Sequence, residues 1–293
     1  MSGPRLFVFG LGYTGLAFAR AMLPHAAAVA GTVRSPVRAA ALRAEGIDAL
    51  VFDGRGPGED VAAALAGATH VLVTISQGES GDPVLAAHGD DLRAAAGLAW
   101  IGYLSTVGVY GDRGGAWVDE DTPPDPRVAR TAARIAVEAA WRAFGAAGGL
   151  PVGIFRLAGI YGPGRNPFVK LAEGTAHRIV KPEQVFNRIH VADIAATLRA
   201  AIARPAARIY NVGDDEPAPP QDVVAFAADL MGVAPPPEVP FAEADLSPMA
   251  RSFYAGNRRI SNRRIRDELG VALAYPTYRD GLAALWRDGT WRG

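Results

Sequence analysis

The stretch Phe7-Val8-Phe9-Gly10-Leu11-Gly12-Tyr13-Thr14-Gly15 decides the fold of this chain. Its apolar start predicts a buried strand, and the apolar pattern after Gly15 predicts a helix. Between them, Gly10 allows a tight turn, Gly12 lets the backbone approach a pyrophosphate, and Gly15 lets the helix pack against the strand. Because the N-terminus of a helix attracts phosphates, this strand, turn and helix predict a dinucleotide site. Tyr13 and Thr14 belong to the same turn.

The composition narrows the class of protein. The 293 residues, 49% of them hydrophobic, are enough for about two soluble globular domains. Lys plus Arg and Asp plus Glu both number 30, so the net charge gives no reason to expect a nucleic-acid or membrane partner. The absence of Cys excludes disulfides and thiolate chemistry. We expect no signal peptide, a cytoplasmic location, and no metal site, because the five His lack ligand spacing.

The first half of the chain alternates between short apolar runs and helical segments. After the first strand, strands are predicted at 27–33, 49–52, 71–75, 100–104 and 152–157. Helices are predicted at 36–46, 61–66, 84–96 and 128–144, and a long loop at 111–126. This alternation indicates βαβ units, and therefore an α/β fold with a doubly wound parallel sheet of the Rossmann type.

The pattern of predicted strands and helices changes after residue 157. Strands become rarer, and helices are predicted at 191–203, 221–231, 257–269 and 280–287, with a short strand at 209–212. We expect a dinucleotide-binding domain at 1–157, to which 186–213 returns. A smaller C-terminal substrate lobe is expected from 158–185 and 214–293.

The end of the second predicted strand bears on the choice between NAD and NADP. A site selective for NAD usually places an acid there, whereas this chain has Arg34-Ser35. Because an Arg can pair with a 2′-phosphate, NADP is favoured over NAD. Alternatively, Arg34 is a surface residue in an arginine-rich chain.

Further cofactor residues are expected at the ends of later strands. Asp53 is placed to accept a hydrogen bond from an adenine amino group, or else to cap the turn at Gly54. Four residues at the ends of the fourth and fifth strands are expected to line the cofactor's path: Thr74, Ile75, Ser76 and Ser105.

Three later segments occur in a characteristic order. They are 105–111 (STVGVYG), 155–164 (FRLAGIYGPG) and 188–193 (RIHVAD). With the glycine turn and Asp53, they make the chain resemble the extended short-chain dehydrogenase/reductases, the NAD-dependent epimerase/dehydratase group that acts on nucleotide sugars. The resemblance spans nearly the whole length. It implies a small-molecule substrate, such as a nucleotide sugar or another polar hydroxyl or carbonyl compound.

The resemblance also implies a catalytic pair that this chain lacks. In that family a Ser or Thr, here Thr106, lies four residues before the Tyr of the VYG segment and bonds the reacting group. A later Tyr-x-x-x-Lys supplies an acid/base Tyr, whose pKa the Lys lowers while it also holds the ribose. Aligning the helix by Glu138 puts Arg130 in the Tyr position and Arg134 in the Lys position. A guanidinium stays protonated and cannot shuttle a proton at neutral pH.

Three interpretations remain open. In the first, Tyr110, Tyr161 or His190 replaces the catalytic tyrosine, although each is also suited to a packing or capping role. In the second, Arg130 holds an anionic substrate while the nicotinamide and Thr106 carry out limited chemistry. In the third, the protein binds NADP without turnover, as a catalytically silent sensor or scaffold.

The substrate side and the assembly rest on the resemblance alone. The expected substrate residues are Tyr110, Arg156, Tyr161, Arg165, Arg188 and His190. Where the family has an Arg four residues before the His, this chain has Phe186, and Arg188 lies two before it. The arginines at 258–266 are expected on a solvated helix face or against an anionic substrate. A homodimer through the helices at 84–96 and 128–144 is expected by analogy.

Overall fold

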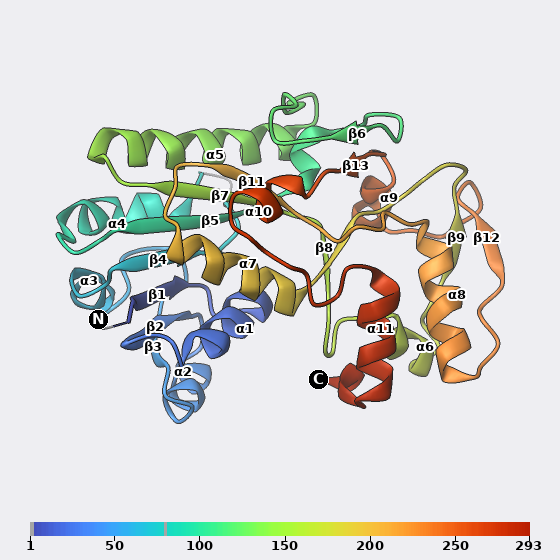
Figure 1. Ribbon diagram of the computed structural model, residues 1–293, viewed down its shortest axis with the longest axis horizontal. Coiled ribbons are helices and arrows are strands. Elements are labelled where there is room, and N and C mark those ends of the chain that lie inside the picture. Colours follow the sequence, from blue (N-terminus) through green and yellow to red (C-terminus); the bar gives the residue numbers. More distant parts are fainter. Residues whose placement is uncertain (1–2, 79–80) are drawn as a thin grey trace. The chain divides into compact units, whose positions relative to one another are not determined.

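The computed structural model describes residues 3–78 and 81–293. Within them, seven strands form one sheet in the order β11-β7-β5-β4-β1-β2-β3 (Figure 1). These strands are β1 (Arg5–Phe9), β2 (Ala28–Val33), β3 (Asp48–Val51), β4 (His70–Val73), β5 (Trp100–Thr106), β7 (Val152–Leu157) and β11 (Ile209–Val212). β1 pairs in parallel with β2 and β4, β2 with β3, and β4 with β5. The predicted doubly wound α/β fold is confirmed.

Helices connect these strands, and short strand pairs accompany them. The helices are α1 (Tyr13–Met22), α2 (Pro36–Arg43), α3 (Val61–Ala66), α4 (Pro83–Ala94), α5 (Ala129–Gly148), α6 (Pro167–Ala172), α7 (Val191–Ala203), α8 (Pro220–Met231), α9 (Pro248–Phe253), α10 (Arg263–Asp267) and α11 (Tyr278–Arg287), with 3-10 helices η1 (Val107–Tyr110) and η2 (Thr290–Arg292). The paired short strands are β6 (Trp117–Val118) with β13 (Arg259–Ile260), β8 (Gly159–Tyr161) with β10 (Arg188–His190), and β9 (Arg178–Val180) with β12 (Glu238–Pro240).

Both faces of the sheet are covered, as the continuous apolar runs of the strands predict. In β1, Phe7 and Phe9 belong to a core cluster that also contains buried residues of α4 and α5. Val8 points to the other face, where a Cβ on Gly15 of α1 would lie 3.2 Å from its Cγ1. The four buried residues of β1, Leu6 to Phe9, therefore fix the end of the strand, and with it the glycine turn.

Local sequence signals set several helix starts. Ser35 caps α2, Asp82 caps α4 and Asn166 caps α6, and each is followed by a Pro in the first turn. Such a cap satisfies backbone N–H groups that the helix itself leaves unpaired. The predicted start of a helix at Ser35-Pro36 is thereby confirmed.

One predicted helix is wrong in part. The segment 257–269 was expected to be helical throughout, but Arg259–Ile260 forms β13 and only Arg263–Asp267 forms α10. Ile260 pairs with Val118 of β6, inside the segment expected to be a long loop. This pairing joins residues far apart in the sequence, so the local pattern does not reveal it.

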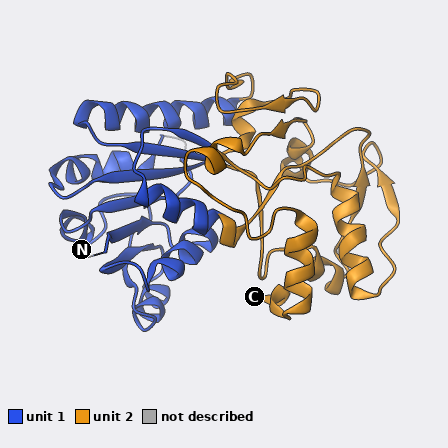
Figure 2. Cartoon of the chain, in the orientation of Figure 1, with its two compact units in different colours: residues 1–105, 129–156, 194–210 blue, residues 106–128, 157–193, 211–293 orange. Residues whose placement is uncertain are grey.

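The chain divides into two compact units (Figure 2). Unit 1 consists of residues 1–105, 129–156 and 194–210, and unit 2 of residues 106–128, 157–193 and 211–293. Unit 1 holds the core cluster that contains Phe7 and Phe9 of β1. Unit 2 has an aromatic cluster of its own, which includes Phe168, Tyr278 and Trp291.

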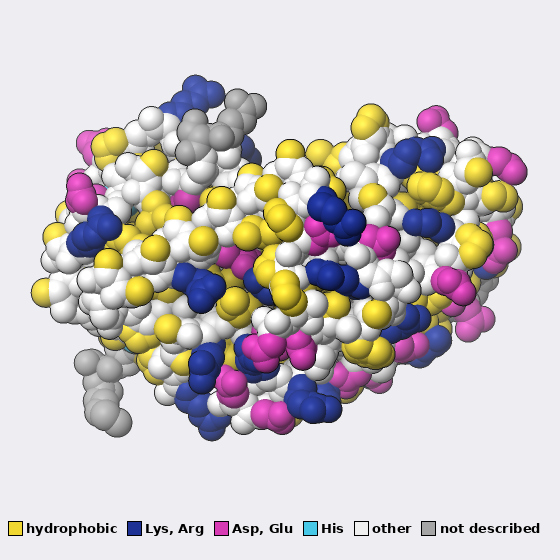
Figure 3. Space-filling view, turned by 90° about the horizontal axis from the view of Figure 1, so that it is seen from above, with side chains coloured by type: hydrophobic (Ala, Val, Ile, Leu, Met, Phe, Trp, Pro, Cys, Tyr) yellow, Lys and Arg dark blue, Asp and Glu magenta, His cyan; other side chains and the backbone are white. Residues whose placement is uncertain are grey.

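Opposite charges alternate on the face displayed in Figure 3, where Lys and Arg lie among Asp and Glu. Exposed ion pairs of the described residues include that between Arg20 and Glu45 at 2.8 Å. Among the described residues, no helix combines the length and hydropathy needed to cross a bilayer.

Candidate functional site

The glycine turn of unit 1 is closely packed at two of its three glycines. Gly10 has a φ of +96°, and a Cβ there would lie 2.6 Å from the Thr74 hydroxyl oxygen. A Cβ on Gly15 would lie 2.1 Å from the carbonyl oxygen of Gly10. A side chain fits at neither position, so both glycines are required by the turn itself.

Gly12 is different, because no atom of the described residues lies within 4 Å of the position a Cβ would occupy. It is the N-cap residue of α1, and within the described part of the chain no side chain caps that helix. The first-turn N–H groups of a helix are unpaired within the helix and attract anions. The turn therefore fits a pyrophosphate, with open space over Gly12 and half-buried Tyr13 and Thr14 in the first turn.

Two threonines hold the turn in place. The Thr32 hydroxyl accepts a hydrogen bond from the Gly10 N–H at 3.0 Å, and the Thr74 hydroxyl donates to the Gly10 carbonyl at 2.6 Å. Thr74 was expected to line the cofactor's path, and its hydroxyl is engaged with the backbone. Thr32 was not singled out in the sequence, although a buried polar residue in an apolar strand is a usable signal.

The remaining expected cofactor residues follow strand ends. Arg34 and Ser35 are exposed after β2, and the Ser35 hydroxyl accepts from the Arg38 N–H. Asp53 is exposed after β3, and its carboxylate accepts from the Arg55 N–H at 2.9 Å, as in a turn-capping role. After β4, Ile75 is half-buried and Ser76 is exposed.

The two arginines in the positions of the family's Tyr and Lys lie on α5. Arg130 is exposed. Arg134 is half-buried and donates a 2.7 Å hydrogen bond to the hydroxyl of Tyr103 on β5. Burial raises the pKa of Tyr103 to about 12, although the nearby Arg134 opposes the shift. Tyr103 therefore stays a neutral phenol, and it was not singled out in the sequence.

A buried ion pair fixes α5 to the sheet in unit 1. Glu138 pairs with Arg156 of β7 at 2.7 Å, and it accepts a 2.5 Å hydrogen bond from Ser105 of β5. The three residues are 3%, 2% and 6% exposed, respectively. Arg156 was expected on the substrate side and Ser105 near the cofactor, but their polar groups meet Glu138 in the core.

Thr106 and Tyr110 lie at the two ends of η1 in unit 2. The Thr106 hydroxyl caps η1 by accepting from the Gly108 N–H at 3.1 Å. Tyr110 is fully buried and donates to the side-chain oxygen of Asn211 at 2.7 Å. This contact gives Tyr110 the packing role that was its alternative in the sequence.

Tyr161 and His190 pack against each other in unit 2, with ring centroids 5.2 Å apart. Burial raises the pKa of Tyr161 well above its usual value. Burial lowers the pKa of His190 to about 4, and its Nδ1 accepts from the Ala192 N–H at the start of α7. At neutral pH the first is a protonated phenol and the second a neutral imidazole.

Arg188 lies close to Asp214, a residue that was not singled out in the sequence. Its guanidinium donates to the carbonyls of Phe186 and Ala218 at 2.9 and 3.1 Å. Burial raises the pKa of Asp214 to about 8, against the effect of Arg188. Arg165, also expected on the substrate side, is exposed.

Arginines of the 258–266 segment form hydrogen bonds and ion pairs with other residues of unit 2. Arg258 and Arg259 donate to backbone carbonyls of the 111–115 segment. Arg264 pairs with Asp121 at 2.8 Å, and Arg266 pairs with Asp215. The contacts of Arg258, Arg259 and Arg264 join the C-terminal segment to the loop around β6, and that of Arg266 joins it to the residues after β11.

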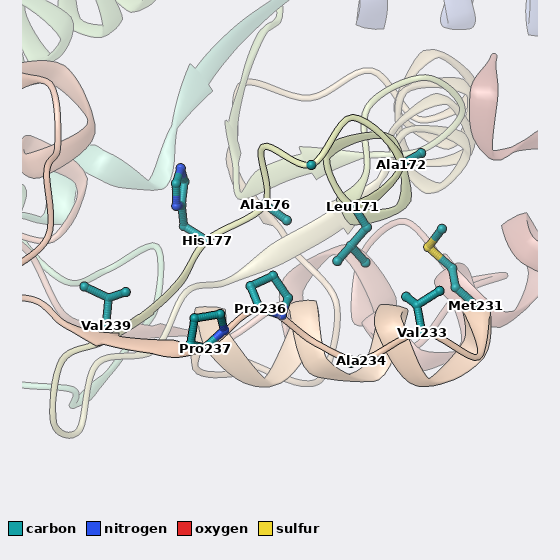
Figure 4. Close-up of a pocket in the computed structure, with 11 residues that line it drawn as sticks. Leu171, Ala172, Ala176, His177, Met231, Val233, Ala234, Pro236, Pro237 and Val239 are labelled. Atoms are coloured by element: carbon teal, nitrogen blue, oxygen red, sulfur yellow. The ribbon is translucent and has the colours of Figure 1, made fainter.

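Unit 2 also contains an apolar pocket of about 530 Å³ (Figure 4). Its lining comes from α6, α8, β12 and the segments before β9 and β12: Leu171, Ala172, Gly174, Ala176, His177, Met231, Val233, Ala234, Pro236, Pro237 and Val239. His177 is its one polar side chain, so this lining lacks the donors that a diphosphate requires. The described residues contain no cluster of three or more His, Cys, Asp or Glu that could hold a metal ion.

The fold and the glycine turn define a dinucleotide-binding α/β protein. A model of the NAD dependent epimerase/dehydratase family matches residues 10–213. The chain belongs to that family. A Streptomyces protein named 3-diazoavenalumate denitrifying reductase is 30% identical over 214 residues, 67% of this chain and 68% of that protein.

Solved structures agree with this assignment. A functionally unknown conserved protein from Silicibacter pomeroyi DSS is 51% identical, with a TM-score of 0.88 over 98% of this chain and 99% of that one. A double mutant of the dTDP-glucose 4,6-dehydratase DesIV of Streptomyces venezuelae, solved with NAD bound, has a TM-score of 0.75. It is 21% identical over 97% of this chain and 96% of that chain, so this likeness concerns the fold.

Proposed function

We propose that the chain binds NADP(H) at the glycine turn and acts as a reductase on a small polar molecule. The open space over Gly12 carries this proposal, since the neighbouring glycines are closed and Gly12 alone leaves room for a pyrophosphate. When bound, the nicotinamide supplies hydride transfer. The first turn of α1 would hold the diphosphate, and Arg34 with Ser35 would hold the 2′-phosphate.

The preference for NADP rests on the end of β2. Arg34 is exposed there, and no acid takes the place of the ribose-binding carboxylate that NAD sites use. Calorimetric titration with NADP⁺, NADPH, NAD⁺ and NADH tests it. We expect tight NADP(H) binding that Arg34→Ala weakens and that Arg43→Ala, an exposed arginine at the other end of α2, leaves unchanged. Equal affinity for NAD(H) and NADP(H) would contradict the preference.

The reduction we propose takes its hydride from bound NADPH and its proton from water, with charge in place of a proton-transferring tyrosine. Tyr110, Tyr161 and His190 are buried in packing contacts. Their burial argues against the interpretation in which one of them takes over the role of the missing tyrosine. Arg130 is exposed and can attract an anionic group on the substrate. The Streptomyces relative is named a reductase, which favours reduction over sugar epimerisation.

The rival function is NADP binding without turnover, as a sensor or scaffold. It is favoured by the loss of both members of the Tyr-x-x-x-Lys pair, since Arg130 and Arg134 cannot exchange a proton. The double variant Arg130→Tyr with Arg134→Lys separates the two functions. Turnover of a candidate sugar or carbonyl by this variant would show that the rest of the site is competent. Cofactor binding with no turnover in either the variant or the wild type supports the rival.

We also propose a homodimer through α4 and α5. One face of α5 exposes a row of small side chains at helical spacing: Ala133, Ala136, Ala140, Ala143 and Ala147. Small residues let two helices approach closely. Sedimentation velocity on the wild type and on Ala136→Arg tests this proposal, and a wild-type monomer at micromolar concentration would overturn it.

A further inference from the structure

Tyr103 lies in a buried, hydrogen-bonded part of unit 1. Its ring is fully buried and stacks on Trp141, with centroids 6.1 Å apart and planes at 27°. The Trp141 indole donates to the Asp82 carboxylate at 3.0 Å, and Asp82 in turn accepts from the first N–H groups of α4. The phenol is therefore held from behind by a chain of side chains that ends in a helix cap.

Arg134 is the long side chain that meets this buried phenol. It lies on α5, half-buried, and donates to the Tyr103 hydroxyl at 2.7 Å. A free Arg side chain samples many rotamers, and fixing it costs conformational entropy. Because burial raises the pKa of Tyr103 to about 12, the phenol stays neutral and leaves the charge of the guanidinium intact. The contact thus orders Arg134 without neutralising it.

We propose that Tyr103 is a positioning residue that orders Arg134 for the ribose next to the nicotinamide. The inference rests on the proposed function, because Arg134 occupies the position of the Lys that holds the ribose in the family. In the family, that Lys lies one helical turn from the catalytic Tyr and lowers its pKa. Because the catalytic Tyr acts beside the nicotinamide, the ribose that the Lys holds is the nicotinamide ribose. Tyr103 would prepare the cation before the cofactor arrives.

The test compares a whole cofactor with a half of it. NADPH contains the nicotinamide ribose, whereas 2′,5′-ADP lacks it and still carries the 2′-phosphate. We expect Tyr103→Phe to weaken NADPH binding about two- to tenfold in calorimetry, the cost of immobilising one long side chain. Its affinity for 2′,5′-ADP should equal that of the wild type. An equal loss for both ligands, or no loss for either, would overturn the proposal.

Two further variants separate positioning from a general loss of structure. Tyr110→Phe removes another hydrogen bond of a fully buried tyrosine, also 2.7 Å long, and should leave NADPH affinity unchanged at similar thermal destabilisation. In an Arg134→Ala background, Tyr103→Phe should have no further effect on NADPH affinity. Additive losses would contradict the inference. If the wild type binds no dinucleotide at all, the proposed function fails and this inference fails with it, whereas wild-type binding with an unaffected Tyr103→Phe overturns only the inference.

Discussion

Replacing Glu138 with alanine removes the carboxylate that joins α5, β5 and β7 in the core of unit 1. The guanidinium of Arg156, 2% exposed, then loses a partner at 2.7 Å, and the Ser105 hydroxyl loses its acceptor. Breaking a buried ion pair by removing one partner costs about 3–5 kcal/mol. The hydroxyl adds about 1 kcal/mol. We therefore expect Glu138→Ala to lower the free energy of unfolding by about 4–6 kcal/mol, a large share of the usual 5–15 kcal/mol.

Urea unfolding followed by circular dichroism measures this loss. An ion pair of nearly the same length, between Arg20 and Glu45 at 2.8 Å, is 52% and 39% exposed and serves as the control. Glu45→Ala should cost less than about 1 kcal/mol, because solvent screens an exposed pair. Changing both buried partners, Glu138→Leu with Arg156→Met, should cost much less than Glu138→Ala, since no charge stays buried. The reasoning is refuted if Glu138→Ala costs no more than Glu45→Ala.

Four other predictions concern the glycine turn and unit 2. Gly15→Ala, whose Cβ would lie 2.1 Å from a carbonyl oxygen, should destabilise the protein in urea unfolding by about 1–3 kcal/mol. Gly12→Ala should keep the stability of the wild type and lose at least about tenfold in dinucleotide affinity measured by calorimetry. Equal stability of the two variants would contradict this. The folded pKa of Asp214 is raised to about 8 from 3.8, so its contribution to stability is fully present below pH 3.8 and is lost as the pH rises to 8. The difference in unfolding free energy between the wild type and Asp214→Asn should therefore fall with rising pH, with a slope of up to about 1.4 kcal/mol per pH unit. The folded pKa of His190 is lowered to about 4 from 6.5, so the unfolded chain binds more protons in this range and wild type minus His190→Gln should fall as the pH drops from 6.5 to 4; a flat difference would show that the imidazole is not desolvated. Tyr110→Phe should cost about 1 kcal/mol in thermal unfolding, and a stabilised variant would mean that the bond to Asn211 contributes nothing.

The sequence predicts well those elements that local signals determine. The helices at 61–66 and 191–203 and the strands at 152–157 and 209–212 have the predicted bounds. Each is an apolar run with its own period, bounded by turn or capping residues. The glycine turn is equally local, because strand, turn and helix are contiguous in the chain.

The predictions that failed, and the residues that were missed, depend on contacts between distant segments. β13 forms because Ile260 meets Val118, and no periodicity near residue 260 announces such a pairing. Tyr103 looks like an ordinary strand residue until Arg134 reaches its hydroxyl from another element. The cofactor contacts expected of Arg34, Asp53 and Ser76 stay predictions, since only a bound dinucleotide can test them.

The division of the chain into units constrains how the protein can be made. The chain passes from one unit to the other after residues 105, 128, 156, 193 and 210. A ribosome that has released residues 1–156 has therefore delivered most of unit 1 but not its 194–210 segment, and β6 must wait for β13 near the C-terminus. Native folding of both units is thus delayed until late in synthesis. No single cut in the chain yields either unit whole and alone. Producing one unit by itself therefore requires joining three segments that are separated in the sequence.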